Sequence, residues 1–181
     1  MTRIPVGQLC ISPRRFRGDC AQRLLEIASS QQIPIRLLRD GDRLGNASVL
    51  LANRTFRQSA ENNSSVVLRI AAGERRVLLT GDIERETESD LAGRIGRADV
   101  LKVAHHGSRS SSTGAFLDAV SPSIALISCG PHNMFGHPHA EVLRRLEDRG
   151  ARVFRTDVNG SIELTFTAGH IFVRWQIDTP R

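Results

Sequence analysis

Cysteine is scarce in this sequence, and long apolar runs are missing. The three cysteines, Cys10, Cys20 and Cys129, are too few and too scattered for a disulfide framework or a zinc site of paired CxxC motifs. No apolar run approaches the ~20 residues that span a bilayer, and the first ten residues lack the features of a signal peptide. We therefore expect no membrane segment in this chain and, by default, a reducing cytoplasmic compartment.

Lysine is almost absent as well. Of the 25 basic residues only Lys102 is a lysine, so the pI near 10.7 partly reflects the high pKa of arginine. The formal net charge of +6 is compatible with a polyanionic partner such as nucleic acid, although charge alone does not establish one. With 40% hydrophobic and 24% charged residues, the composition excludes disordered, collagen-like and coiled-coil classes.

The 181 residues fit one α/β domain with a mixed sheet, because strand and helix patterns alternate without a repeat or a linker. A turn at Gly73-Glu74 predicts a hairpin. The expected strands are 7–12, 33–38, 47–52, 65–71, 76–79, 100–104, 124–128, 153–156, 162–166 and 171–176, and the expected helices are 19–29, an acidic helix whose first turn carries Asp82, 113–120, and one starting at Pro138.

Five of the six histidines fall between positions 105 and 139, after two strands that are expected to be buried. Imidazoles gathered at strand ends are typical of a divalent-metal site, because the sheet fixes the ligands while the loops leave a coordination position open. His105 and His106 cannot both project the same way from an extended backbone, so one can ligate while the other faces substrate or a second carboxylate. A structural histidine pair remains an equal alternative.

Asp82 follows the apolar run at 78–79 and a glycine, so its carboxylate is expected at the exit of a buried strand. An oxygen ligand there can bridge two cations. The alternative, and on the residue alone the more frequent role, is that Asp82 caps the acidic helix. Farther along, the hydroxyl-rich stretch 108–113 with Arg109 suits phosphate.

The segment 128–139 reads SCGPHNMFGHPH and gathers three histidines and an asparagine. His137 lies between Gly136 and Pro138, in a rigid turn just before a helix, where it can ligate metal or protonate a leaving group. His132 and His139 are expected in solvent.

Five segments in this order resemble the metallo-β-lactamase-like domain of ComEC-type DNA-uptake (competence) proteins. The combination of TGD, HHGS and GHPH is the most specific part of the resemblance. The segments are NNSSVVL (62–68), LLTGDIE (78–84), ADVLKVAHHGS (98–108), SCGPHNMFGHPH (128–139) and FRTDVNGSI (154–162). The resemblance implies an αββα sandwich of two mixed sheets between outer helices, of which this chain resembles the C-terminal half with its mixed sheet and flanking helices.

The resemblance also implies a cofactor, two divalent ions of zinc or manganese in an intact relative. Asp82 matches the bridging carboxylate, and the pair His105-His106 matches the source of a second-site ligand, with His106 favoured.

On the substrate side, the resemblance implies that His137 and Asn133 lie above the metals as catalytic residues. Ser108 or Arg109 would hold a nonbridging phosphate oxygen. The implied reaction is phosphodiester cleavage of DNA during competence-related uptake, in a family associated with a bacterial membrane channel. A small phosphoester such as a phosphocholine ester is the alternative substrate, and a non-catalytic remnant or nucleic-acid-binding fragment is the alternative without catalysis.

One departure from the family pattern stands out: the metal motif HxHxDH belongs upstream, and no histidine precedes His105. We therefore expect residues 1–181 to form a single metallo-β-lactamase-like domain that lacks the portion bearing this motif, and to hydrolyse little alone. An uncovered apolar sheet face would then favour self-association. The residues expected on that face are Val66, Leu68, Ile70, Val77 and Leu79.

Overall fold

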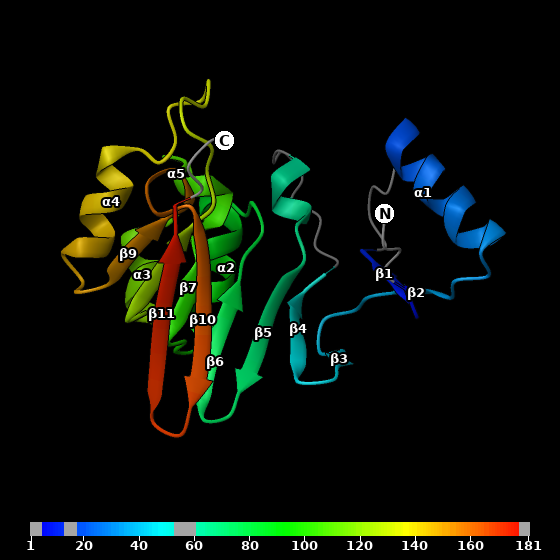
Figure 1. The fold of residues 1–181 in the computed structure, drawn as a ribbon, viewed down its shortest axis with the longest axis horizontal. Helices are drawn as coiled ribbons and strands as arrows, with labels where there is room; N and C mark the ends of the chain where they lie inside the picture. The colour runs from blue at the N-terminus through cyan, green and yellow to red at the C-terminus, as the bar shows by residue number, and fades with distance from the viewer. Residues whose placement is uncertain (1–4, 13–17, 53–60, 178–181) are drawn as a thin grey trace.

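A computed structural model describes residues 5–12, 18–52 and 61–177, and a seven-stranded mixed sheet forms its centre (Figure 1). The strand order is β3-β4-β5-β6-β7-β8-β9, antiparallel from β3 to β6 and parallel from β6 to β9. The strands are β3 (Arg43–Leu44), β4 (Ala47–Leu51), β5 (Val67–Ala72), β6 (Arg75–Leu79), β7 (Val100–Lys102), β8 (Ile124–Ile127) and β9 (Arg152–Arg155).

Three helices make the parallel crossovers and cover one face of this sheet: α2 (Arg85–Ile95), α3 (Gly114–Val120) and α4 (Ala140–Glu147). Because side chains alternate between the two faces of a strand, Leu78 and Leu101 point to the helices. They pack with Phe116 of α3 and Leu146 of α4 in the largest core cluster. Burying one such side chain contributes about 1.5–3 kcal/mol. The packing of the three helices on the sheet therefore stabilises the arrangement of β6, β7 and β8, the strands that precede the candidate site.

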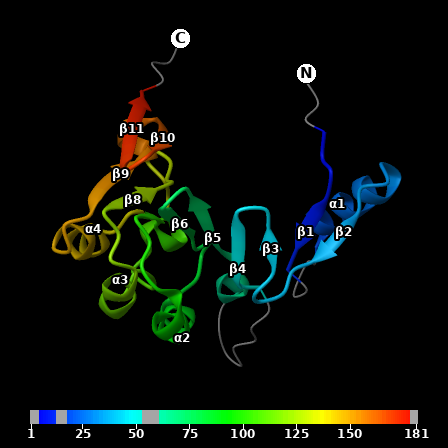
Figure 2. The same ribbon diagram turned by 90° about the horizontal axis from the view of Figure 1, so that it is seen from below.

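A hairpin of β10 (Ser161–Thr167) and β11 (His170–Gln176) lies over the opposite face (Figures 1 and 2). Its inward residues, among them Leu164 and Phe166, pack against Val100, Ile124 and Phe154 of the central sheet. A short helix, α5 (Thr156–Asn159), leads from β9 into this hairpin.

The sheet face that was expected to be bare is therefore partly covered. All five residues predicted on it are half-buried. Val77 packs against the hairpin, while Val66 and Leu68 pack beside Leu38 and Val49. The prediction of an exposed patch at these residues is wrong, because β10 and β11 fold back over Val77 and the segment that contains Leu38 packs beside Val66 and Leu68.

The N-terminal strands and helix form a small unit beyond the β3 edge of the sheet (Figures 1 and 2). Here β1 (Leu9–Ile11) pairs in parallel with β2 (Ile35–Leu37), and α1 (Asp19–Ser30) connects them. Several large apolar side chains of α1 and β2 stay exposed, namely Leu24, Ile27, Ile35 and Leu37.

Most strands and helices agree with the sequence prediction to within a few residues. The polar composition of 53–63 also predicts a loop, and residues 53–60 of it lie outside the described part of the chain. The structure adds the two-residue strand β3 and two single-turn 3₁₀ helices, η1 (Glu61–Ser64) and η2 (Ala104–Gly107). Within the described ranges, none of the helices has the length and apolarity needed to cross a membrane.

Candidate metal-binding site

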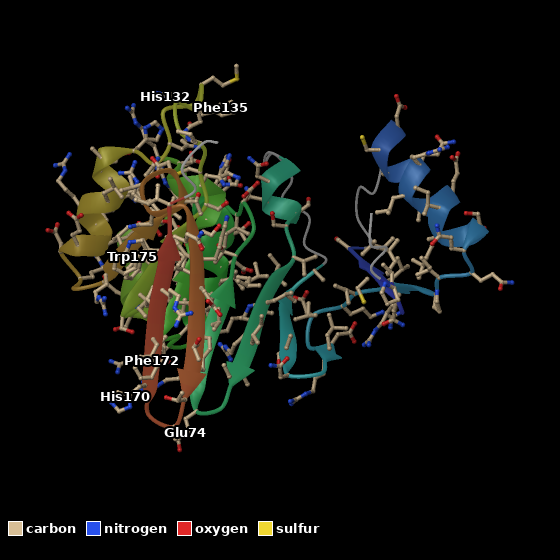
Figure 3. The ribbon with its side chains drawn as sticks, in the orientation of Figure 1. Glu74, His132, Phe135, His170, Phe172 and Trp175 are labelled. Atoms are coloured by element: carbon tan, nitrogen blue, oxygen red, sulfur yellow. The ribbon has the colours of Figure 1, made fainter. Side chains whose placement is uncertain are left out.

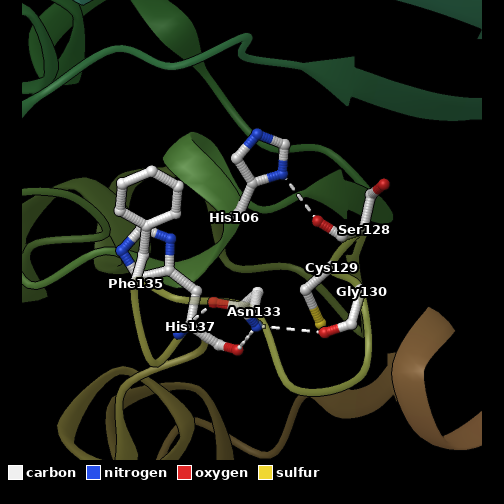
Figure 4. Close-up of a pocket in the computed structure, with 7 residues that line it drawn as sticks. All are labelled: His106, Ser128, Cys129, Gly130, Asn133, Phe135 and His137. Carbon is white, nitrogen blue, oxygen red and sulfur yellow. Dashed lines mark hydrogen bonds between the residues drawn. The ribbon is translucent and has the colours of Figure 1, made fainter.

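The candidate site lies where three parallel strands end. Asp82 follows β6, the histidine pair follows β7, and the loop containing His137 follows β8. Since the carboxyl ends of parallel strands meet at one edge of a sheet, their loops converge there. Asp82, His106 and His137, which span 55 positions of the sequence, are thereby brought close together, as the labelled side chains of Figure 4 show for the last two loops.

Asp82 and His106 face each other at this edge. The Oδ1 of Asp82 lies 3.6 Å from the Nε2 of His106, and their side chains are 39% and 43% exposed. On its other side, the His106 Nδ1 donates a hydrogen bond of 2.6 Å to the Ser128 carbonyl oxygen (Figure 4). A carbonyl can only accept, so Nδ1 carries a proton, and in the neutral tautomer this leaves the Nε2 lone pair free on the side of Asp82.

The backbone around Asp82 fits a site rather than a helix cap. Gly81 has φ +59°, and a Cβ there would lie 2.7 Å from the Cβ of Ser65. The Asp82 N–H donates to the Ser65 hydroxyl at 3.0 Å. Helix α2 begins only at Arg85 with Glu84 in the capping position, so the predicted capping role and first-turn position of Asp82 are wrong.

His105 and His106 lie in the turn η2, both with positive φ (47° and 55°), and not on an extended backbone. Their side chains separate: His106 turns to Asp82, and the His105 Nδ1 lies 3.4 Å from Glu84 Oε1. That Nδ1 is buried, and the contact lacks the alignment of a hydrogen bond. Asn62 closes this second group, because its Nδ2 donates to Glu84 Oε1 at 3.2 Å and lies 3.4 Å from the His105 Nε2.

Asn133 organises the third loop. Its Nδ2 donates to the carbonyls of Gly130 (3.0 Å) and His137 (2.7 Å), and its Oδ1 accepts from the His137 N–H at 2.9 Å (Figure 4). The amide that was predicted to face substrate is thus engaged in shaping the loop that presents His137.

The His137 ring stands among other rings, 5.7 Å from His105 and 5.1 Å from His139 between centroids. Burial lowers the pKa of His137, and the neighbouring imidazoles, His139 first, lower it further. The neutral ring favoured here can accept a proton or ligate a metal. His139, predicted in solvent, is half-buried against His137, whereas His132 is exposed.

The predicted phosphate residues lie to one side. The Ser108 hydroxyl lies 3.1 Å from the Ser110 hydroxyl, and the exposed Arg109 approaches Glu141 of α4 at 3.9 Å. Within the described part of the chain, no contact joins either residue to the Asp82–His106 pair. Glu84 and Ser128 were not recognised from sequence as parts of the site, although Glu84 ends one quoted motif and Ser128 begins another.

A cavity of about 450 Å³ opens beside His106 and His137, within the usual range of ligand pockets (Figure 4). Its lining residues are His106, Ser128, Cys129, Gly130, Asn133, Phe135 and His137. The site therefore combines a carboxylate–imidazole pair with an adjoining space for a small group.

The donor chemistry at the pair suits a divalent ion, but the number of donors is insufficient. Across the residues that the structure describes, no group of three or more His, Cys, Asp or Glu side chains is placed to hold a metal. The undescribed stretches contain neither histidine nor cysteine. A catalytic zinc site needs three protein ligands, so Asp82 and His106 by themselves do not complete one.

Comparison with known proteins identifies the class. Residues 58–132 match the metallo-beta-lactamase superfamily. A protein of Parabacteroides distasonis ATCC 8503, assigned as a metal-dependent hydrolase, has a similar fold with a TM-score of 0.53 at 13% identity, covering 83% of this chain and 64% of that one. The fold is therefore that of the metallo-β-lactamase superfamily, with a mixed sheet and flanking helices, and the cofactor class that the superfamily indicates is a divalent metal.

Curated relatives narrow the class further. The chain is 35% identical over 150 residues to ComE operon protein 3 of Bacillus subtilis, which covers 80% of this chain and 19% of that protein. It is 39% identical over 114 residues to competence protein ComA of Neisseria gonorrhoeae, covering 61% and 16%. Recombination protein 2 of Haemophilus influenzae is 39% identical over 107 residues, covering 59% and 14%. The chain spans about a fifth or less of these relatives. It is a metallo-β-lactamase-like domain of the type found in competence proteins.

Proposed function

We propose that this chain is part of a metal-dependent phosphodiesterase domain that acts on DNA in competence-related uptake, and that alone it is catalytically incomplete. The observation that carries the proposal is the Asp82–His106 pair, 3.6 Å apart, with the His106 ring oriented by Ser128. An imidazole that donates one N–H to a carbonyl and turns its other nitrogen outward has the arrangement of a metal-ligating histidine.

In this proposal, Asp82 and His106 would contribute to holding divalent ions, zinc or manganese, of which the complete site would contain two. Such an ion neutralises phosphate charge and activates water when its coordination is complete. This chain provides two ligands, so the remainder must come from a portion bearing the HxHxDH motif. His137, positioned by Asn133, borders the cavity from the substrate side. In its protonated form it would give a proton to the leaving oxygen of the ester as the P–O bond breaks.

DNA is the proposed substrate for two reasons. The relatives include proteins named for competence, and the net charge of +6 favours a polyanion. Among the described residues, Arg109 has one ion pair, a 3.9 Å contact to the half-exposed Glu141, so it can turn toward a phosphate oxygen, with Ser108 one residue away.

The proposal is tested by comparing this chain with a fusion that adds the HxHxDH-bearing portion of a competence relative. Manganese-dependent cleavage of bis(p-nitrophenyl) phosphate and linear DNA is measured for both. We expect background rates from the chain alone and cleavage by the fusion that Asp82→Ala abolishes. His170→Ala, in the hairpin turn at the far end of the sheet, is the matched control and should leave the rate unchanged.

Turnover by the chain alone that Asp82→Ala abolishes would contradict incompleteness. If the fusion still cleaves its substrates after Asp82→Ala and after His106→Ala, the proposed roles of these two residues as metal ligands are contradicted. A p-nitrophenyl phosphocholine ester in the same assay tests the small-phosphoester alternative, because preferential cleavage of that ester would replace DNA as the substrate. An inactive fusion that binds DNA would favour the non-catalytic alternative.

A further inference from the structure

Two large apolar side chains are displayed at the tip of the loop beside the cavity. Met134 is 89% and Phe135 is 69% exposed. The loop is nonetheless well defined, because Asn133 makes three side-chain hydrogen bonds across it and the Gly136 N–H donates to the Asn133 carbonyl at 3.1 Å. The exposed apolar tip is thus held in place by polar contacts and not by burial of its own side chains.

The Phe135 ring has a defined orientation toward the site (Figures 3 and 4). It stacks on the His137 ring, with centroids 5.8 Å apart and planes inclined by 25°. It also lines the cavity that His106 borders. A flat aromatic surface therefore stands next to the carboxylate–imidazole pair.

An exposed aromatic ring binds planar groups well by stacking. In a nucleic-acid strand the planar groups are the nucleobases. In a duplex each base is stacked between its neighbours, so only an unpaired base can reach such a face. The positive net charge attracts the phosphates, and the cavity of about 450 Å³ offers space for one such group beside the pair.

We propose that Phe135 is a stacking platform for a base of single-stranded DNA that crosses the candidate site, and that this platform selects single strands over duplex. The inference rests on the proposed function, whose substrate class it makes specific. Each base stacked on an aromatic side chain strengthens binding about 5- to 150-fold, enough to set this preference.

A lipid surface is the competing ligand for an exposed Phe–Met tip. The stacking of Phe135 on His137 and its position in the cavity wall favour the base, because insertion into a bilayer would need a ring directed away from the site.

The test measures fluorescence anisotropy with the chain as it exists, in EDTA, so that no hydrolysis occurs. One probe is a short oligothymidylate, and the other is an abasic strand with the same number of phosphates. We expect the chain to prefer the oligothymidylate, and Phe135→Ala to weaken that binding by about 5- to 150-fold, to the level of the abasic strand.

Matched variants separate stacking from other effects. Phe135→Trp should keep the preference, whereas Phe135→Leu, which stays apolar but loses the flat ring, should lose it. Phe172→Ala removes a phenylalanine that is 58% exposed at the far end of the molecule and should change nothing (Figure 3).

Equal affinity for the two probes, or a preference that survives Phe135→Ala, overturns the inference. Binding to phosphatidylglycerol vesicles that depends on Phe135, without a preference for bases, overturns it in favour of a lipid surface. If the fusion cleaves DNA but the chain binds both probes equally, the stacking role of Phe135 is refuted and the proposed function stands. If the chain prefers the oligothymidylate but the fusion cleaves nothing, the proposed hydrolysis is refuted and the stacking role stands.

Discussion

Gly107 joins the histidine turn to the loop of His137, and replacing it with alanine should disturb both. The residue has φ +84°, and a Cβ there would lie 2.5 Å from the Cβ and 3.1 Å from the Cα of Pro138. The Gly107 carbonyl accepts a hydrogen bond of 3.0 Å from the His139 N–H. The two loops therefore touch through backbone, with no flexible side chain that can move aside.

The expected cost of Gly107→Ala has two parts. A left-handed backbone costs a residue with a Cβ about 1–2 kcal/mol. Ordinary contact begins near 3.4 Å, so the Pro138 Cβ must retreat by 3.4 − 2.5 = 0.9 Å. Overpacking of that kind costs about 1–3 kcal/mol, which gives about 2–5 kcal/mol in total.

Gly136→Ala is the matched control in the same loop. Gly136 has φ +65°, and nothing lies within 4 Å of a Cβ built there, so this variant should lose only the backbone part, about 1–2 kcal/mol. Urea unfolding of both variants at neutral pH measures the two free energies of unfolding. If Gly107→Ala destabilises the protein no more than Gly136→Ala, the close approach of the two loops is refuted.

The other predictions concern metal binding, the buried Glu88 and self-association. Calorimetric titration with zinc or manganese should show micromolar or weaker binding, about −8 kcal/mol or less favourable, that is lost in Asp82→Ala and His106→Ala and kept in His170→Ala; tight binding to the chain would refute the two-ligand site. Glu88 is buried and accepts N–H bonds from the two residues before α3, so Glu88→Gln should cost about 1–3 kcal/mol in urea unfolding. Burial raises the pKa of Glu88 above its ordinary value of 4.5. The proton that the folded protein holds on Glu88 therefore stabilises it fully below pH 4.5, and this contribution is lost as the pH rises through the folded pKa. If the difference in free energy of unfolding between wild type and Glu88→Gln does not change with pH across that range, this expectation is contradicted. Sedimentation velocity should show self-association through the exposed apolar residues of α1 and β2, and a monomer at every concentration would contradict it.

The convergence of the loops could be predicted because it depends on local signals. The runs at 78–79, 100–101 and 124–127 are apolar on both faces, as buried parallel strands require, and each is followed directly by a polar residue. Parallel strands place their carboxyl ends together, so the convergence of Asp82, His106 and the loop of His137 follows once these strands are neighbours in the sheet. The resemblance to the metallo-β-lactamase-like domain, which rests on the order of the motifs, indicated that these strands are neighbours.

The covering of the second face could not be predicted in the same way. Ile162, Leu164 and Phe166 alternate as in any half-buried strand, and alternation says which side chains are buried but not against which surface. The sequence of β10 and β11 fits a hairpin beside the sheet and a hairpin above it equally well. Only the long-range packing on Val100, Ile124 and Phe154 decides between them.

The conformation of the histidine turn was also beyond local reasoning. Nothing in the pair His105-His106 demands positive φ, and an extended backbone was the natural expectation. Contacts from distant segments impose the turn: the His105 N–H donates to the Gly81 carbonyl at 3.1 Å, and Gly107 lies against Pro138. The helix-cap alternative for Asp82 failed for a related reason, since α2 starts three residues later than the acidic pattern suggests.

Under the proposed function, the Asp82–His106 pair is a preorganised part of a metal site, and it contributes little to stability. Both side chains are about 40% exposed, and an exposed carboxylate–imidazole pair contributes only about 0–1 kcal/mol to folding. The bond from His106 to Ser128 nevertheless fixes the ring in one orientation, at a cost in side-chain entropy. Such an arrangement benefits the binding of a further group, because the donor is already oriented when the ligand arrives. Asp82→Ala should therefore leave the free energy of unfolding nearly unchanged while removing the metal, which is why it can separate a defect in chemistry from a defect in folding.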